Sequence, residues 1–459
     1  MRIKYHIICA AALGFCGPAA VFSGGESFIR DISEENAFTY QGMQYLIEND
    51  GKTDYIRVTG FTDDLPSELT VPAEIDGIPV RSLGAAAFQH CSGLKRVEIS
   101  EGVWFVGYAA FGECENLEYA VLPESLREIN FSVFEACSAL TGVDFPACGE
   151  TRIPNSMFAG CSSLRGIDLP DNITEIQAGS FQGCTGLTEI EIPESVISVE
   201  GFAFKDCSNL AVIQIPERVS EIQGLAFEGT AWLQARRQEN PLVIVNGMLL
   251  DGRAAQGDVK IPEGVTVLCS RSFQGNAALT GIAFAASVNR ISSYAFRECD
   301  ALTEVTIPET VSRIGAEAFF PCANLRSVTI RNPACSFYHL LRTFPPGIRL
   351  CCDDDALFRA DAQQYYQVES FVQENLTGDF DGDGEIGIAD AQLVLNAYTK
   401  ALAGVDPALT AAQRTACDVN SDGAVDAADA QLVLIYYVKN VLAGIPAAWA
   451  EILAERSES

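Results

Sequence analysis

Ser180-Phe-Gln-Gly-Cys-Thr-Gly-Leu-Thr-Glu-Ile-Glu-Ile-Pro193 is one copy of a pattern that fills the middle of this chain. In each copy a small or apolar residue precedes Phe, a Cys usually stands three residues after the Phe, and Leu-x-x-apolar-x-apolar-Pro follows. A fixed period of this kind indicates stacked structural repeats. The Phe recurs at steps of 23 residues, with one step of 24, at Phe88, Phe111, Phe134, Phe158, Phe181, Phe204 and Phe227, and again at Phe273, Phe296 and Phe319.

Each repeat is expected to form one coil of the chain. The alternation in Leu187–Pro193 predicts a short strand that buries Ile190 and Ile192. An apolar pair, Val196 and Val199, then precedes the return to the next Phe. One coil cannot bury its own apolar face, whereas stacked coils cover one another. The sequence therefore predicts a repeat solenoid with a 23-residue period, built from short strands joined by irregular or helical returns.

The array is interrupted once and is flanked by segments of other composition. The interval from Phe227 to Phe273 is 46 residues, or two periods, which predicts a degenerate coil at about residues 231–260. Open solenoid ends expose core, so caps are expected at both ends. We assign residues 24–80 to a strand-rich N-terminal cap, 81–332 to the solenoid, and 333–376 to a C-terminal cap and linker.

Half of the 16 cysteines share one repeat position, and Thr230 and Asn276 fill the same position in two other coils. A position that accepts Cys, Thr and Asn is small and half-polar, so buried free thiols are predicted there. Zinc is not supported, because no CxxC or clustered His accompanies these cysteines. Cys335 is within possible reach of Cys351 or Cys352, which leaves a disulfide open. The shared positions are Cys91, Cys114, Cys137, Cys161, Cys184, Cys207, Cys299 and Cys322.

The repeating unit resembles the BspA-like leucine-rich repeat, which is known mainly from bacterial surface and secreted proteins. The resemblance covers about residues 65–330. It implies an elongated body that serves interaction rather than catalysis.

Two further stretches near the C-terminus, 379–390 and 418–429, each place oxygen side chains at loop positions 1, 3, 5 and 12 and glycine at position 6. A hard cation such as Ca²⁺ needs six to eight oxygen ligands, and the glycine permits the sharp turn around it. Position 7 offers a main-chain carbonyl, and position 9 often acts through water. The predicted ligands of the two ions are Asp379, Asp381, Asp383, Glu385 and Asp390 in the first loop, and Asp418, Asn420, Asp422, Ala424, Asp426 and Asp429 in the second.

The same helical sequence follows both loops. Ala-Asp-Ala-Gln-Leu-Val-Leu occurs at 389–395 and again 39 residues later at 428–434. Each loop is expected to open an amphipathic helix, giving a small all-α domain whose two halves pack together. An EF-hand would need a helix before Asp379, where too few residues are present, and carries Glu rather than Asp at position 12.

This paired segment, residues 377–446, resembles a dockerin, the module that attaches secreted subunits to cohesin domains of a cellulosome scaffold; 447–459 is then a tail. The resemblance implies calcium-dependent cohesin binding through the helix starts. Because these starts are nearly identical, either half could dock after a half-turn rotation. They are small and apolar, unlike the Ser-Thr pair of some dockerins, which leaves the cohesin class open. The implied contact residues are Ile388, Ala389, Gln392, Ala427, Ala428 and Gln431.

Composition restricts partners and location. The formal net charge is −31, from 61 acidic and 30 basic residues, which disfavours nucleic acid and anionic membranes as partners. Residues 1–23 have a basic start followed by an apolar run and predict an export signal cleaved near Ser23. The run is short and contains Gly and Pro, so no membrane span is expected. A lipoprotein signal ending at Cys16 is an alternative. The protein is therefore expected to be secreted, extracellular and cellulosome-associated.

Few groups suit catalysis. His90 precedes Cys91, which admits a thiol nucleophile, but Gly112-Glu113 and Gln182-Gly183 fill the same stretch in other coils, which favours ordinary repeat surface. No GxSxG, phosphate-loop or HExxH motif is present. A non-enzyme is expected, in which the dockerin binds a scaffold and the polar, acidic strand face binds an unknown protein. Two alternatives stay open: an unrecognised carbohydrate- or protein-active enzyme or inhibitor carried to plant fibre by the dockerin, and a cell-surface adhesin.

Overall fold

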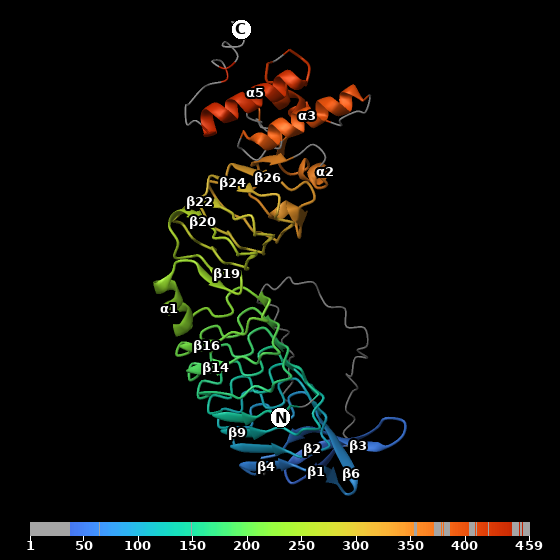
Figure 1. The fold of residues 1–459 in the computed structure, drawn as a ribbon. Helices are drawn as coiled ribbons and strands as arrows, with labels where there is room; N and C mark the ends of the chain where they lie inside the picture. Colours follow the sequence, from blue (N-terminus) through green and yellow to red (C-terminus); the bar gives the residue numbers. More distant parts are fainter. Residues whose placement is uncertain are drawn as a thin grey trace.

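A computed structural model describes residues 37–63, 65–147, 149–352, 356–370, 378, 380, 386–403, 409, 411–420, 422–442, 449 and 452. The predicted export signal lies outside these residues, as do Asp379, Asp381, Asp383 and Glu385 of the first loop. Figure 1 shows stacked turns that run from the N-terminal strands to a group of helices at the C-terminal end. The predicted solenoid is confirmed.

The strand predicted after each Leu forms the first of two ladders along the stack. Its strands pair in parallel with those of the next turn; Ile190 of β14, for example, lies opposite Ile213 of β16. Residues 165–170, between β11 and β14, have no strand. The first ladder comprises β4 (Glu68–Val71), β7 (Arg96–Ile99), β9 (Tyr119–Val121), β11 (Gly142–Asp144), β14 (Glu189–Glu191), β16 (Val212–Gln214), β20 (Gly257–Lys260), β22 (Leu279–Ala283), β24 (Glu304–Ile307), β26 (Ser327–Ile330), β28 (Arg349–Cys352) and β29 (Gln367–Ser370).

Each return contains a second strand that the sequence analysis did not identify. Most of these strands have two residues, of which the second is buried; Val199 of β15 is paired with Ile176 and Ile222 of the neighbouring turns. The second ladder comprises β6 (Ile78–Leu83), β8 (Phe105–Val106), β10 (Glu128–Ile129), β12 (Arg152–Ile153), β13 (Glu175–Ile176), β15 (Ser198–Val199), β17 (Glu221–Ile222), β21 (Val267–Leu268), β23 (Arg290–Ile291), β25 (Arg313–Ile314) and β27 (Ser336–Phe337).

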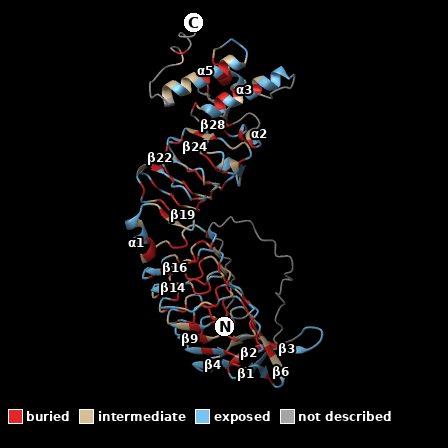
Figure 2. Ribbon diagram, in the orientation of Figure 1, coloured by how far each residue is buried: buried red, intermediate tan, exposed pale blue. Residues whose placement is uncertain are grey.

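The repeated Phe rings form the centre of the core. Figure 2 shows buried residues recurring along the stacked turns. Successive rings lie face to face with centroid separations of 4.8–5.8 Å. The first stack runs from Phe88 to Phe227 and ends against Trp232. The second runs from Phe273 to Phe344. Phe344 lies in the predicted C-terminal cap, so that segment continues the stack in addition to closing it.

The repeated cysteines make a second set of contacts between turns. Cys184 Sγ donates to the carbonyl oxygen of Phe158 at 3.1 Å, and six other repeat cysteines make the same bond at 3.0–3.1 Å. In the same slot, the Oγ1 of Thr230 donates to Phe227 O at 2.7 Å, and the Nδ2 of Asn276 donates to Gly252 O at 3.1 Å. The prediction of buried thiols outside any disulfide is confirmed, and among the described residues Cys335, Cys351 and Cys352 form no disulfide either.

Two left-handed residues bracket each repeat ring from Phe88 to Phe296 and allow the tight return. Around Phe204 they are Phe202, with φ 63°, and Asp206, with φ 61°. Glycine occupies the second position at Gly160, Gly183, Gly229 and Gly275, where it adopts this conformation at no steric cost.

The N-terminal cap consists of β1 (Ala37–Tyr40), β2 (Met43–Asn49) and β3 (Asp54–Phe61), which pair antiparallel, and the short β5 (Glu74–Ile75). β3 then pairs in parallel with β6 and joins the second ladder. At the other end, β28 and β29 extend the first ladder, with the 3-10 helix η2 (Leu340–Arg342) and α2 (Arg359–Ala362) between turns.

The degenerate coil contains a helix and a hairpin. α1 (Ala231–Glu239) begins at Thr230, whose side chain accepts from the Leu233 N–H, and is followed by the antiparallel pair β18 (Val243–Val245) and β19 (Met248–Asp251). Gly252 lies flat on Phe273, where a Cβ would come within 2.2 Å of the ring. The helix and hairpin fill the interval between Phe227 and Phe273, and this joint divides the Phe stack in two.

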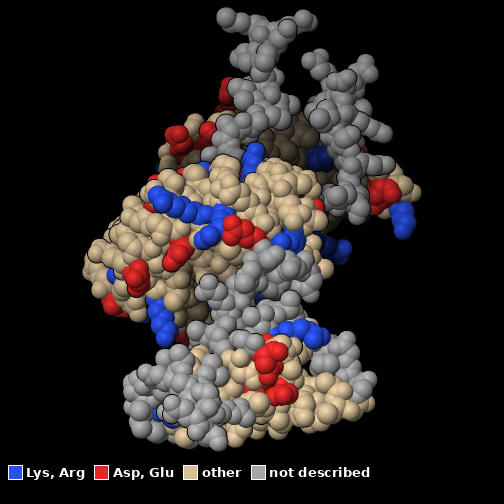
Figure 3. Space-filling model, turned by 90° about the horizontal axis from the view of Figure 1, so that it is seen from above, with Lys and Arg blue, Asp and Glu red and all other residues tan. Residues whose placement is uncertain are grey.

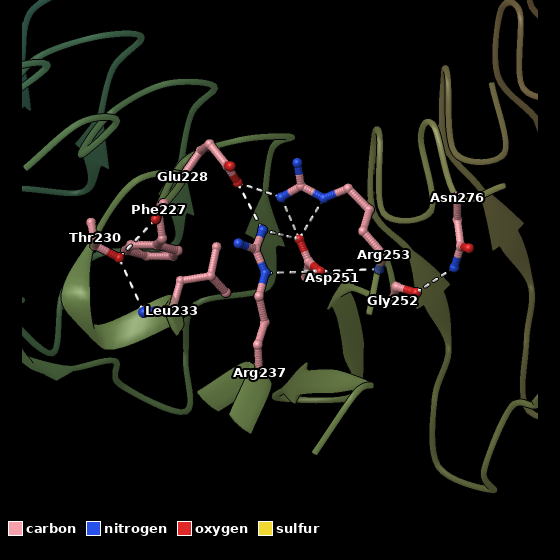
Figure 4. Close-up of polar contacts among 9 residues, drawn as sticks. All are labelled: Phe227, Glu228, Thr230, Leu233, Arg237, Asp251, Gly252, Arg253 and Asn276. Atoms are coloured by element: carbon pink, nitrogen blue, oxygen red, sulfur yellow. Dashed lines mark hydrogen bonds and ion pairs between the residues drawn. The ribbon is translucent and has the colours of Figure 1, made fainter. Parts of the chain in front are cut away.

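A buried charge cluster fixes the joint (Figure 4). The Asp251 carboxylate is 2% exposed and accepts from Arg237 Nη2 at 2.7 Å and from Arg253 Nε at 2.8 Å. Glu228, from the last coil before the helix, accepts from both guanidinium groups. Because buried charges are tolerated only when paired and hydrogen-bonded, this balanced set ties α1 and β19 to the first half of the solenoid.

The ring stack predicts a large local effect of truncation. We expect Phe181→Ala to lower the free energy of unfolding by about 3–5 kcal/mol, because it removes a fully buried ring and leaves a cavity. Val212→Ala, at a side chain that is 52% exposed, should change it by less than about 0.5 kcal/mol. Urea unfolding of the two variants measures the difference, and equal effects would contradict the stack as the centre of the core.

The thiol ladder predicts selective chemical protection. Burial raises the pKa of Cys137 to about 12, so little reactive thiolate forms in the folded protein at pH 9. With iodoacetamide at that pH, peptide mass spectrometry should find half-buried Cys351 alkylated first and Cys137 only after urea is added. Alkylation of both at one rate in the native protein would show that the ladder opens readily.

Candidate functional site

Three helices form the C-terminal region, together with a π-helical turn. α3 (Ile388–Leu402) and α5 (Ala427–Tyr437) follow the two predicted loops, and α5 continues into η3 (Val438–Leu442). α4 (Ala411–Cys417) precedes the second loop and was not identified from the sequence, although its composition favours a helix. The carboxylates at position 12 of the two loops bond back to the N-cap main chain of the following helices: Asp390 accepts from Gly387 N at 2.8 Å and Asp429 from Asp426 N at 2.9 Å.

The two halves exchange apolar residues across an approximate two-fold relation. Ile386 and Ala391 of the first half pack with Val419, Leu432 and Val433 of the second. The reciprocal cluster joins Phe380, Leu393 and Val394 of the first half to Val425 and Ala430 of the second. Each member is 39 residues from its counterpart in the other cluster. The packing of two equivalent loop–helix halves, expected from the repeated sequence, is confirmed.

The described core also includes residues from the predicted tail. The Trp449 ring stacks on Tyr436 at a centroid distance of 4.6 Å, and Ile452 is buried in the same cluster. The sequence signal that could have indicated this contact is Trp449, a large aromatic residue within the segment predicted to be a tail.

The second loop is held in shape by its own polar side chains. The Asp418 carboxylate accepts from Asp422 N at 2.9 Å and Gly423 N at 2.8 Å, and Asn420 Oδ1 accepts from Asp422 N at 2.9 Å. Asp422 Oδ1 accepts from Ala424 N at 2.9 Å. Gly423 has φ 88°, which matches the turn expected at position 6. The side chains at positions 1, 3 and 5 therefore turn in toward the same short stretch of main chain.

Asp390 and Asp429 are almost fully buried beneath the loops. Asp429 Oδ1 accepts from Val419 N at 2.9 Å and Asn420 N at 3.3 Å, and Asp390 Oδ1 accepts from Phe380 N at 2.8 Å. Burial raises the pKa of Asp429, against the opposing effect of these N–H groups. Each carboxylate thus links the start of its loop to the start of its helix.

The second loop has an oxygen-only donor set that fits a hard cation. Asp418, Asn420 and Asp422 supply side-chain oxygens, Ala424 a carbonyl oxygen, and Asp426 lies at the α5 N-cap, accepting from Ala428 N at 2.6 Å. Within the described residues no three acidic, His or Cys side chains form a metal cluster by themselves, so the loop would rely also on the amide and the carbonyl. The calcium ligands stay a prediction.

The six implied contact residues lie at the starts of α3 and α5, three on each helix. All are at least partly exposed, and Ile388 is 47% exposed although it is a large apolar residue. None belongs to the two apolar clusters that join the halves. Their exposure leaves them available to a partner, and the cohesin contact that the resemblance implies stays a prediction.

On the solenoid, the first ladder presents an acidic surface. A hollow of about 950 Å³ is lined by acidic residues of successive turns, with Arg218 beside them. Tyr119 of β9 donates to Asp144 and lies under Arg96. The acidic residues lining the hollow are Asp168, Asp171, Glu189, Glu191, Glu194 and Glu217.

The His90–Cys91 pair has no catalytic geometry. His90 is exposed in a left-handed turn with its Nδ1 3.2 Å from Glu113 Oε2. Cys91 is buried, and burial raises the pKa of its thiol. A nucleophile needs the opposite shift, so the interpretation as repeat surface is supported. In the described part of the chain, no helix has the length and apolarity needed to cross a bilayer.

Comparison with known proteins supports both assignments. Residues 67–149, 149–242 and 254–339 match the BspA type leucine rich repeat region in six copies, and residues 377–437 match the dockerin type I domain. A search of curated proteins found no match.

Similar solved structures are leucine-rich repeat proteins. One from T. pallidum is 30% identical, with 44% of this chain and 95% of that chain covered and a TM-score of 0.40. One from Bacteroides ovatus is 19% identical, with 73% and 99% covered and a TM-score of 0.36. A leucine rich cell surface protein from Faecalibacterium prausnitzii is 20% identical, with 74% and 96% covered and a TM-score of 0.38.

The loop geometry predicts a defined metal stoichiometry. We expect the full chain to bind two Ca²⁺ in calorimetry and Asp418→Ala to bind one, because position 1 both ligates and orders the second loop. Glu309→Ala, an exposed residue of the solenoid, removes the same charge and should leave two sites. Two ions in the Asp418 variant would contradict the ligand assignment.

Proposed function

Because the chain belongs to the BspA-type leucine-rich repeat family and carries a dockerin type I domain, we propose that it is a secreted, non-catalytic subunit of a cellulosome-type assembly. Both matched domains are interaction modules, and no enzyme domain was found. The observation that carries the proposal is the pair of equivalent halves, which pack through two reciprocal apolar clusters and leave their helix starts exposed. These helix starts would bind a cohesin of the scaffold.

Calcium would act here through linkage. A bound divalent ion would neutralise the carboxylates that crowd each loop. The chain's own part is to hold Asp418, Asn420 and Asp422 in place through main-chain N–H groups and to tie each loop to its helix through Asp390 and Asp429. Ions that bind only the folded domain stabilise it, by about 2.7 kcal/mol per site at a hundredfold excess over Kd. Chelation should then release the cohesin.

The solenoid would present the second interaction surface. Its first ladder is acidic and poor in exposed aromatic rings, which favours a basic protein surface over crystalline cellulose. The tethered protein would therefore connect the scaffold to another protein.

The two-fold relation predicts two docking orientations. Ala389→Arg or Ala428→Arg alone should weaken cohesin binding only about twofold, because the unaltered half still binds, whereas the double variant should lose it. The measurement is calcium-dependent capture of the full chain on a panel of immobilised cohesins, with chelator as the reference. Leu402→Arg, at an exposed position at the far end of α3, is the control.

Complete loss with Ala428→Arg alone would reject the double orientation while leaving cohesin binding intact as a proposal. Absence of capture by any cohesin in calcium would reject the proposed function.

A further inference from the structure

The sign of the charge changes along the solenoid. Residues 81–230 contain 8 basic and 21 acidic residues, a net charge of −13. Residues 231–352 contain 12 basic and 9 acidic residues, a net charge of +3, in a chain whose total is −31. Figure 3 shows Lys and Arg side chains set among Asp and Glu on the face seen along the stack. The second half of the array is therefore the part suited to an anion.

A hollow of about 260 Å³ lies where the two halves meet, on the side of the second ladder. It exists because the inserted helix and hairpin interrupt the regular ladder between β17 and β21. Gly224 packs directly on Ser270, so the last turn of the first half borders the first turns of the second. The polar and aromatic residues lining it are Phe202, Glu221, Gln223, Ser270, Arg271, Arg290, Ser292, Ser293 and Tyr294.

Two arginines in this hollow lack a carboxylate partner. Within the described residues neither Arg271 nor Arg290 forms an ion pair, although nine of the other arginines do. Arg290 Nε is buried and has no hydrogen-bond partner among these residues. A buried donor without a partner costs about 1–3 kcal/mol, so its retention points to an acceptor that comes from outside.

The other arginine is fixed in place. The Arg271 guanidinium lies 4.5 Å from the Tyr294 ring centroid, and its Nη1 donates to Gln274 Oε1 at 2.9 Å. Burial lowers the pKa of Arg271, which indicates a site where the positive charge is poorly solvated. A planar guanidinium held on an aromatic ring is pre-organised to bind a carboxylate.

The remaining lining distinguishes the kind of carboxylate. Tyr294 and Phe202 offer aromatic surface on opposite sides of the joint, one from each half of the array. Hydroxyls of Ser270, Ser292 and Ser293 and the acceptor Glu221 stand beside the arginines. A sugar ring presents C–H groups to aromatic faces and hydroxyls to such donors and acceptors, whereas an acidic side chain of a peptide would leave the serines and Glu221 unused.

We propose that this hollow binds a uronic acid residue of an anionic polysaccharide. The carboxylate lies between the Arg271 and Arg290 guanidinium groups, and the ring hydroxyls reach the serines and Glu221. The proposal does not depend on cohesin binding, since the hollow belongs to the solenoid alone.

The test is calorimetric titration of the full chain with galacturonate and glucuronate trimers, in chelator so that calcium cannot bridge ligand and protein. Arg290→Met should weaken the binding at least tenfold. Arg313→Met should change it less than twofold, because Arg313 occupies the same ladder position one turn on and lies outside the hollow. The two trimers distinguish galacturonate-rich from glucuronate-rich polymers, and binding of either supports the site.

Galactose trimer and a tri-glutamate peptide complete the experiment. Equal binding of galactose trimer would overturn the role of the carboxylate, and equal or tighter binding of the peptide would reassign the hollow to acidic proteins and overturn the sugar. Equal losses of trimer binding in Arg290→Met and Arg313→Met would also overturn the proposal. If Arg290→Met lowers the melting temperature, Tyr294→Leu and Arg290→Lys replace it, and each should still weaken binding at least threefold.

Discussion

Face-to-face contact between the Phe ring of one turn and that of the next is the interaction on which the rest of the solenoid depends. The ring separations of 4.8–5.8 Å are close to the spacing of paired strands, about 4.8 Å, so both ladders can pair while the rings stay in contact. The left-handed positions that bracket each ring, and the thiol slot three residues after it, follow from the same fixed path.

Sequence reasoning succeeded where a residue type repeats in one structural role. The Phe positions, the first strand of each turn and the equivalence of Cys184, Thr230 and Asn276 were all predictable, because burial and size select those residues. The second strand of each turn was not predictable. A two-residue strand such as β15 has no periodicity of its own, and only its pairing with strands 23 residues away defines it. The left-handed positions were not predicted either, although the glycines at Gly160, Gly183 and Gly229 are a sequence signal for them.

The candidate sites differ in the same way. The repeated loops and helices of the dockerin could be read from sequence, because their ligands and core residues are close in the chain; the placement of Asp379 to Glu385 lies outside the described residues. The hollow at the joint could not be predicted from the sequence. Phe202 and Tyr294, which both line it, are 92 residues apart, and they reach the same hollow only because a whole coil between them is replaced. The buried Glu228–Arg237–Asp251–Arg253 cluster shows that this replacement is a built feature, with every charge balanced.

The thiol-to-carbonyl bonds have a consequence for where such an array can mature. Small extracellular domains commonly depend on oxidised cross-links, which require an oxidant and an isomerase. Here the cysteines join neighbouring turns while remaining reduced, as donors to the carbonyls of Phe158 and its equivalents. A chain of this design needs neither an oxidant nor an isomerase to form these contacts, so the array can reach its final form under reducing conditions.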